Sequence, residues 1–345
     1  MVKERSNPRI LIVTQNWLGD VLFLTPAIRA IRKKYPSAYV ACLTPHRCYF
    51  ALANNPHINE VIGYNDSASL FSFSSLRVIH RLRSQHFDQA ILFHDSKTKA
   101  ILTRLAGIPE RIGYQKLGGK RRPLTRAISK PTLPMHKTKV FLHLLNAIGV
   151  PADGMTPDFF PFLKAGEELD ALFQSFGLSR QLPYVVVHAG GNWDLKRWPA
   201  DSFREWMRLF LEKYDFPIVL CGSENEKKLI KKISAGLDPN QVFSVCGQTT
   251  LDMLAVLLKH AKLVVSNDSG PIHLAASQGA PLLGIFGPTS PDLTGPLSKG
   301  PMKILRKDPG CEIPCYFSSC DTRVCMEWIT PEEVFAASQT LLNDK

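Results

Sequence analysis

The sequence predicts an α/β protein made of two doubly wound halves, each built on a parallel sheet. Three observations support this fold class. The chain has 345 residues, which exceeds the usual size of one hydrophobic core. Short apolar segments alternate with segments of helical periodicity, which is typical of strand–helix–strand units. A segment rich in proline and glycine, residues 150–183, interrupts this alternation and indicates a connection between two domains.

The first half begins with a strand followed by a helix. The apolar run RILIVT (9–14) precedes NWLGDVLFLTPAIRAI (16–31), in which a glycine and Asp20 stand where the strand should turn into the helix. In PAIRAIRKKY (26–35) the apolar positions keep helical spacing, and the arginines and lysines take the other side. Further strands are expected at AYVACLT, EVIGY and DQAILF, with a helix over LFSFSSLRVIHRLRSQ.

The second half repeats the pattern. Its last segment, TPEEVFAASQTLLND, has Thr330 as a helix cap and Pro331 at the first helical position. The expected strands are YVVVHAGG, PIVLCG, VFSVCG, KLVVSND and PLLGIFG, and the expected helices run from Trp198 to Tyr214 and onward from Glu224, Leu251 and Pro271.

Charge is distributed unevenly along the chain, whose net charge is +12. Residues 1–150 hold 23 Lys and Arg against 7 Asp and Glu, giving +16, whereas the remainder holds 19 against 23, giving −4. Such an excess favours an anionic partner: nucleic acid, an acidic membrane surface or a phosphorylated glycan. The densest segment, YQKLGGKRRPLTRAISK (114–130), is expected to be a mobile loop. Its Lys120, Arg121 and Arg122 are candidate ligands of that partner, and a solvated loop without a partner stays open.

Several classes of protein are excluded by absent patterns. No apolar run reaches the roughly 18 residues needed to cross a bilayer, and no secretory signal is recognisable, so the expected location is the cytoplasm. Neither half shows G-x-G-x-x-G after a strand, which argues against a dinucleotide oxidoreductase, and no Walker A motif occurs. No D-x-D occurs either. We therefore expect no cofactor and no metal at the active site.

Four of the eight cysteines fall in CEIPCYFSSCDTRVC, at Cys311, Cys315, Cys320 and Cys325. Their spacing lacks the tight C-x2-C pair of common zinc sites, and disulfides would be unusual in a reducing cytoplasm. A structural or fortuitous cluster is favoured over a metal site, which stays open.

Two segments of the second half suggest phosphate binding. In HAGGNWDLKRWP, Gly190 and Gly191 let a ligand approach the backbone, and Lys196 supplies a charge ahead of a helix start. The alternative is a surface loop followed by a capped helix.

The segment VVSNDSGPIHL is the second. Backbone donors at Ser269 and Gly270 open a helix and suit a diphosphate, while the carboxylate of Asp268 suits sugar hydroxyls and His273 lies on the first turn. Taken one by one, Asp268 could be a helix cap and His273 a buried hydrogen-bonding group.

The motifs NDSGPIHLAA, GPTSP, KRWP and LGDVLFLTPAIRAI together resemble the ADP-heptose:lipopolysaccharide heptosyltransferases of glycosyltransferase family 9, in particular the heptosyltransferase II branch. The resemblance implies the GT-B fold, in which two Rossmann-like domains face each other across a cleft. It implies an acceptor-binding domain over 1–160, a nucleotide-sugar-binding domain over 161–329, and a final helix, 330–345, that packs back on the first domain.

The resemblance also implies roles for particular residues. Asp20 is implied as the catalytic base, although a plain helix cap would explain its position as well. Lys196 is implied as a phosphate ligand, Glu224 as a ligand of the adenosine ribose and Thr249 as a neighbour of the adenine. Around the diphosphate and heptose the resemblance places Asp268, Ser269, Gly270 and His273.

The expected reaction is therefore inverting, metal-independent transfer of heptose from ADP-heptose to the inner core of lipopolysaccharide. The expected partners are that donor and an anionic lipopolysaccharide acceptor at the inner membrane surface, with no nucleic acid and no stable protein partner. Peripheral attachment to the inner face of that membrane stays open. Two alternatives also stay open: transfer of another nucleotide-activated sugar, and non-catalytic binding of an anionic glycolipid or nucleic acid.

Overall fold

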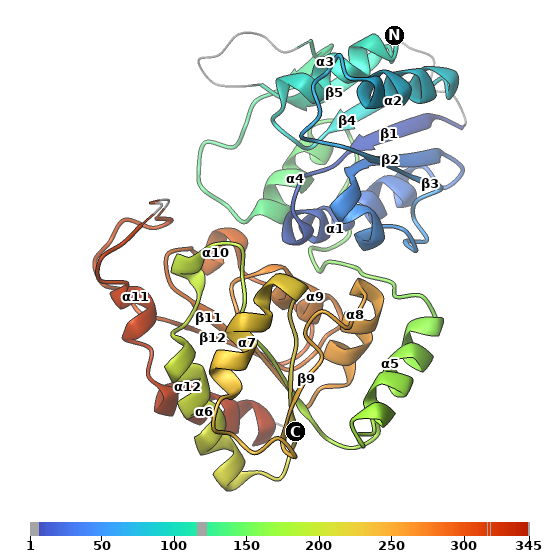
Figure 1. Cartoon of the computed structure of the whole chain (residues 1–345). Coiled ribbons are helices and arrows are strands. Elements are labelled where there is room, and N and C mark those ends of the chain that lie inside the picture. Colours follow the sequence, from blue (N-terminus) through green and yellow to red (C-terminus); the bar gives the residue numbers. More distant parts are fainter. Residues whose placement is uncertain (1–6, 116–122, 316, 318, 344–345) are drawn as a thin grey trace. The chain divides into compact units, whose positions relative to one another are not determined.

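The computed structural model describes residues 7–115, 123–315, 317 and 319–343. The chain divides into two compact units, Met1–Phe160 and Pro161–Lys345. Within the described residues, each unit contains one six-stranded sheet in which all neighbouring strands are parallel, with helices on both faces (Figure 1). The α/β class expected from the alternating pattern is confirmed.

The sheet of the first unit has the strand order β3-β2-β1-β4-β5-β6. Strand β1 is buried from Ile10 to Val13, because both of its faces are covered by helices, and its sequence is accordingly apolar without alternation. The elements are β1 (Arg9–Val13), α1 (Leu18–Lys34), β2 (Tyr39–Pro45), η1 (His46–Ala51), β3 (Glu60–Tyr64), α2 (Phe73–Ser84), β4 (Gln89–Leu92), α3 (Lys97–Leu105), β5 (Glu110–Tyr114), β6 (Arg126–Ile128) and α4 (Lys137–Asn146).

The helices of this unit form two layers. Helices α1 and α4 pack together on one face of the sheet, and α2 and α3 pack together on the other (Figure 1). Helix α1 buries Val21, Leu22, Leu24 and Ile28, while Lys33 and Lys34 of its last turn are exposed. The helical spacing in the sequence correctly predicted that Ala27, Ile28 and Ile31 are buried and that Lys33 and Lys34 are exposed. Arg29 and Arg32, expected on the solvent side, are instead half-buried and hydrogen-bonded to Asp153 and Asn59.

The second unit has the strand order β12-β11-β10-β7-β8-β9. Helices α6, α7 and α12 cover one face of its sheet, and α5, α8 and α9 cover the other (Figure 1). The elements are α5 (Lys164–Ser175), β7 (Val185–His188), η2 (Asp194–Lys196), α6 (Ala200–Lys213), β8 (Ile218–Leu220), η3 (Glu224–Glu226), α7 (Lys227–Ser234), β9 (Val242–Ser244), α8 (Leu251–His260), β10 (Leu263–Asn267), α9 (Gly270–Ser277), β11 (Leu282–Phe286), α10 (Pro291–Thr294), β12 (Met302–Arg306), α11 (Val324–Glu327) and α12 (Pro331–Asn343).

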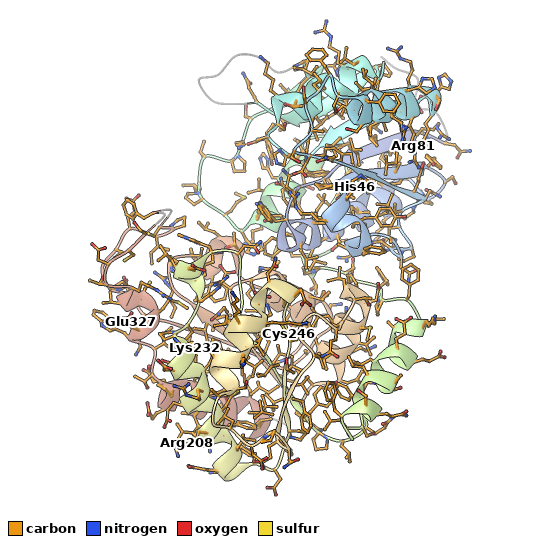
Figure 2. The ribbon with its side chains drawn as sticks, in the orientation of Figure 1. His46, Arg81, Arg208, Lys232, Cys246 and Glu327 are labelled. Atoms are coloured by element: carbon orange, nitrogen blue, oxygen red, sulfur yellow. The ribbon has the colours of Figure 1, made fainter. Side chains whose placement is uncertain are left out.

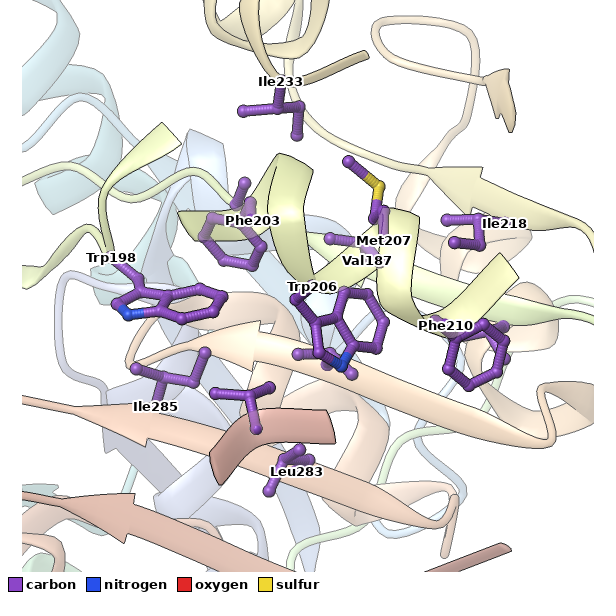
Figure 3. Close-up of a cluster of buried hydrophobic side chains, with 14 of the residues drawn as sticks. Val187, Trp198, Phe203, Trp206, Met207, Phe210, Ile218, Ile233, Leu283 and Ile285 are labelled. Atoms are coloured by element: carbon purple, nitrogen blue, oxygen red, sulfur yellow. The ribbon is translucent and has the colours of Figure 1, made fainter. Parts of the chain in front are cut away.

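Large aromatic side chains fill the core of the second unit on the α6 side. Figure 3 shows Trp206 and Phe210 of α6 lying against the sheet, beside Trp198 just before that helix. Both indoles are fully buried and satisfied, since Trp198 Nε1 donates to Ile329 O at 2.8 Å and Trp206 Nε1 donates to the Ser338 hydroxyl at 3.2 Å.

Helix α12 belongs to this same core. Its residues Val334, Ala337 and Leu341 are buried in the aromatic cluster, and it packs on α6 and on β10, β11 and β12. This corrects the expectation that the final helix packs back on the first domain. The physical reason is the apolar stripe of α12, which is covered by Trp206 and the sheet of its own unit.

Two further predictions need correction, and three strands were missed. The connection over 150–183 contains a helix, α5, whose Ala165, Leu169 and Phe173 form a buried stripe. The loop expected over 114–130 contains β6, a three-residue edge strand that pairs with β5. Strands β5, β6 and β12 were not predicted, because their segments ERIGY, RAI and MKILR are only three to five residues long and mix charged with apolar residues without a regular period.

Each sheet has one point where the strand order reverses direction. In the first unit it lies between β1 and β4, and in the second between β7 and β10. Open α/β sheets bind ligands outside the carboxyl ends of the strands at such a point. None of the helices in the described part of the chain is both long and apolar enough to cross a membrane.

Candidate active site

Asp20 lies at the reversal point of the first sheet, in the first turn of α1. Its Oδ1 is 2.8 Å from Nζ of Lys137, the first residue of α4. The two side chains keep exposed fractions of 19% for Asp20 and 32% for Lys137, so both remain accessible to a substrate. The cap position of α1 is Trp17, whose side chain makes no cap hydrogen bond. The carboxylate is therefore held by a lysine from a neighbouring helix.

Lys99 fixes the segment that leads from β1 to Asp20. Its buried ammonium nitrogen donates to Thr14 O at 2.8 Å and to Asn16 Oδ1 at 2.7 Å. Burial lowers the pKa of Lys99 to about 7. A neutral amine still has two N–H donors, which match the two accepting oxygens, so loss of the proton breaks neither hydrogen bond.

His94 lies on the opposite side of this reversal point, after β4. Burial, followed by the charge of Lys99, lowers the pKa of His94 to about 4, so its imidazole is neutral at pH 7. The charges of Lys137 and Asp20 also act on it, which places these groups at one edge of the sheet. Its buried Nδ1 has no hydrogen-bond partner within the described part of the chain.

The reversal point of the second sheet brings together the predicted carboxylate and lysine. Lys196 Nζ lies 2.7 Å from Oδ2 of Asp268, and the Thr289 hydroxyl donates to the same oxygen at 2.6 Å. His273 Nε2 is 3.9 Å from the other carboxylate oxygen. Asp268 is buried, with 4% of its side chain exposed, whereas Lys196 is 25% exposed. The buried charge is thus paired, and the ammonium still faces solvent.

Asn267, at the end of β10, is hydrogen-bonded to the segment that follows β7. Its side-chain amide donates to Ala189 O at 2.7 Å and its Oδ1 accepts from the backbone N–H of Trp198 at 3.1 Å. Ser269 follows as the cap residue of α9, and its hydroxyl lies 3.0 Å from His188 Nδ1. The start of α9, which includes Gly270, therefore stands beside the end of β7.

Gly190 and Gly191 lie where close approach to the backbone is needed. A Cβ atom at Gly190 would collide with the carboxylate of Glu226, and Gly191 has a φ of 150°. Glu226 accepts from Gly191 N at 2.8 Å and from Ser223 N at 2.7 Å. Burial alone would raise the pKa of Glu226, but nearby His188 and these N–H donors lower it.

Two predicted residues lie farther along the same edge. Glu224 follows β8 and Thr249 follows β9. These two strands are one and two strands away from β7, on the side opposite to β10. The Glu224 side chain is 68% exposed and pairs with Lys227 at 2.7 Å. The structure thus groups Gly190, Gly191, Lys196, Asp268, Ser269, Gly270 and His273 at the reversal point, and not Glu224 or Thr249.

Sequence reasoning missed several polar residues at these two edges. Thr289 lies in the GPTSP motif, so the motif carried a signal for it. No sequence signal marked Lys99 or Lys137. The contact of Lys99 with Asn16 spans 83 residues of chain, and the contact of Lys137 with Asp20 spans 117.

Other predicted residues give different outcomes. Lys120, Arg121 and Arg122 lie outside the described residues. The four cysteines of 311–325 are free thiols, exposed or half-buried. Among the residues that the structure describes, no group of three or more His, Cys, Asp or Glu side chains is arranged to hold a metal ion.

Comparison with known proteins settles the family. The sequence pattern of glycosyltransferase family 9 (heptosyltransferase) matches residues 75–316. The chain belongs to glycosyltransferase family 9. This confirms the expectation from the motifs and makes the chain a glycosyltransferase.

Relatives within family 9 span most of the chain. Lipopolysaccharide heptosyltransferase 2 of Escherichia coli is 29% identical over 302 residues, covering 84% of this chain and 86% of the relative. The protein of the same name from Salmonella typhimurium is 28% identical with the same coverage. These relatives agree with the expected heptosyltransferase II branch.

Solved structures of family 9 share the fold. The E. coli ADP-heptose lipopolysaccharide heptosyltransferase II gives a TM-score of 0.78 at 25% identity, covering 97% of this chain and 98% of that one. A family 9 glycosyltransferase from Veillonella parvula gives 0.85 at 21% identity, covering 98% of each chain, which bears on the fold alone. The two parallel six-stranded sheets match the GT-B architecture of these enzymes.

Proposed function

We propose that this glycosyltransferase moves a heptose from ADP-heptose to the inner core of lipopolysaccharide, as a heptosyltransferase II. The similarity to the E. coli heptosyltransferase 2 sequence and to the E. coli heptosyltransferase II structure supports this choice of donor and acceptor. One structural observation supports the proposal most directly. The ammonium of Lys196 pairs with the Asp268 carboxylate just before the start of α9. A diphosphate and a sugar hydroxyl suit that pair of charges.

In this proposal Asp20 is the general base. The acceptor hydroxyl gives its proton to the Asp20 carboxylate as its oxygen forms a bond to the anomeric carbon of the heptose. The bond from that carbon to the β-phosphate oxygen breaks, and its electron pair leaves with ADP. Attack opposite to the leaving group inverts the anomeric configuration. Lys137 holds the carboxylate in its orientation while the proton moves.

The leaving diphosphate is stabilised by the second unit. Negative charge grows on it in the transition state, so Lys196 and the backbone donors at Ser269 and Gly270 stabilise that state more than the ground state. His273 and Asp268 are assigned to the heptose. Lysine supplies the positive charge here, so we propose that the reaction needs no metal, and a chelator should leave the rate unchanged.

The acceptor is assigned to the basic first unit. Lys120, Arg121 and Arg122 are proposed to bind phosphate groups of the inner core, in keeping with the +16 charge of residues 1–150. We place the enzyme in the cytoplasm, peripherally attached to the inner face of the membrane that holds the acceptor. Glu224 and Thr249 keep their proposed places at the ribose and adenine, beyond the diphosphate along the sheet edge.

One experiment tests the function. The protein is incubated with ADP-heptose and core lipids truncated at successive positions, and ADP release and the mass of the lipid are measured. The proposal expects one added heptose on a heptose-bearing inner-core acceptor. Transfer from a different nucleotide sugar, with none from ADP-heptose, would instead favour the alternative donor.

A further inference from the structure

Five aromatic side chains in the first unit face solvent. Their exposed fractions run from 36% for Tyr49 to 81% for Phe71, which is high for side chains that normally supply core area. Soluble proteins leave few such groups together without a binding purpose. We name this set the aromatic rim: Trp17, Tyr49, Phe50, Phe71 and Phe73.

The topology places the aromatic rim along one edge of the sheet. Trp17 follows β1, and Tyr49 and Phe50 lie in η1 directly after β2. Phe71 lies on the connection from β3 to α2, and Phe73 is the first residue of α2. Strands β3, β2 and β1 are neighbours in that order and run parallel. Their carboxyl ends therefore meet at one edge, and this is the edge that also carries Asp20.

Arg47 ties the three connections together. Its Nε donates to Asn16 O at 2.9 Å, on the segment after β1. Its other two nitrogens bind the Asp66 carboxylate at 2.7 and 2.6 Å, on the segment after β3. The guanidinium also lies 4.9 Å from the centre of the Trp17 ring. The rim is thus joined by a bidentate ion pair and a cation–π contact.

Helix α2 continues the rim with a mixed apolar and basic surface. It buries Ile79 and Leu82, while Leu76 and Arg77 are exposed and the Arg77 guanidinium lies 4.9 Å from the centre of the Phe73 ring. Figure 2 labels Arg81 on this helix, where it pairs with Glu60, and His46 on η1 of the same unit.

We infer that the aromatic rim is the surface by which the enzyme docks on an anionic lipid bilayer. Aromatic rings favour the membrane interface, and the exposed Arg77 beside the Phe73 ring suits anionic headgroups. The +16 charge of residues 1–150 complements such a surface. The inference rests on the proposed function, because a lipid-linked acceptor has to reach Asp20 from a membrane, and the rim lies at that edge.

A flotation assay with the full-length protein tests this. The vesicles contain phosphatidylethanolamine and phosphatidylglycerol, without glycolipid, and a parallel set contains phosphatidylcholine alone. The variant combines Phe71→Ser with Phe73→Ser, two highly exposed positions whose change should leave thermal unfolding unaltered. Its matched control combines Leu105→Ser with Leu163→Ser, which also removes two exposed apolar side chains, neither of which belongs to the rim.

We expect wild type and control to float with the anionic vesicles, and the rim variant to bind them about tenfold or more weakly. Transfer to a water-soluble acceptor fragment should be the same in all three proteins. Equal flotation of the rim variant and the wild type would overturn the inference, as would a rim variant that changes only the oligomeric state in lipid-free buffer, because the rim would then be a protein interface.

The outcomes separate this inference from the proposed function. Rim-dependent flotation without any heptose transfer would leave the docking surface standing and refute the function. Heptose transfer together with flotation that does not depend on the rim would support the proposed function and refute the docking surface.

Discussion

Lys137 at the start of α4 places its ammonium 2.8 Å from the carboxylate of Asp20 in the first turn of α1. The two helices pack against each other on one face of the first sheet, so the pair is fixed by the packing of both. The ammonium restricts the directions in which the carboxylate can point. A base that must meet an acceptor hydroxyl at hydrogen-bond distance depends on that restriction.

Removal of this ammonium should slow the chemical step. We predict that Lys137→Met lowers kcat about tenfold, because the carboxylate loses its fixed orientation, and leaves ADP affinity unchanged. Steady-state kinetics and calorimetry with ADP measure the two effects. Lys139→Met, which changes an exposed lysine on the same helix, is the control and should behave as wild type. A Lys137→Met enzyme with normal kcat would show that the ion pair is only structural.

Lys99 should make stability depend on pH. Burial lowers its pKa in the folded chain from 10.5 to about 7, so between these values the unfolded chain binds more protons. The free energy of unfolding of the wild type should therefore rise with pH relative to Lys99→Met, by at most about 1.4 kcal/mol per pH unit. Below pH 7 the difference should be constant. Urea unfolding at a series of pH values measures it, and parallel curves for the two proteins would contradict the assignment.

Lys196 should govern donor affinity. We predict that Lys196→Ala weakens ADP binding about tenfold or more, because a charged hydrogen bond to the diphosphate is lost. Lys196→Arg should rescue only part of it, since a planar guanidinium does not replace a compact ammonium. Lys213→Ala, an exposed change at the end of α6, serves as the control. Unaltered calorimetry of Lys196→Ala would remove this residue from the donor site.

The basic segment around Lys120 should act on the acceptor alone. Replacing Lys120, Arg121 and Arg122 with Gln should raise the acceptor KM and flatten its dependence on salt, because salt screens the attraction between these positive charges and the phosphates of the acceptor. ADP affinity should not change. Initial rates at several salt concentrations test this, and acceptor kinetics identical to wild type at low salt would make the segment a solvated surface.

The sequence predicted best what short segments determine by themselves. The alternation of apolar and amphipathic segments predicted the α/β class. One motif predicted the strand end, turn and helix start around Asp268, Ser269 and Gly270, because these are contiguous in the chain. Contacts between residues far apart in the sequence could not be predicted. The partner of Asp20 comes from another helix, and the apolar stripe of α12 does not say which sheet covers it.

Edges and exposed ends were also poorly predicted. Strand β6 has three residues with its first two exposed, so no hydrophobic periodicity marks it. The resemblance singled out Glu224 and gave no role to Glu226, two residues later. In the structure it is Glu226 that reaches the glycines after β7, while Glu224 pairs with Lys227.

The role of Asp20 is the central claim, and Asp20→Asn tests it because Asn keeps the shape of Asp but is a far weaker proton acceptor than a carboxylate. The measurement is kcat for heptose transfer from ADP-heptose, with ADP calorimetry and thermal unfolding as controls for donor binding and folding. The account predicts that kcat falls on the order of a hundredfold or more, because general-base assistance is lost, while ADP affinity and melting temperature barely change. A kcat near that of the wild type would contradict it and would leave Asp20 as a residue of the helix start, with the base elsewhere.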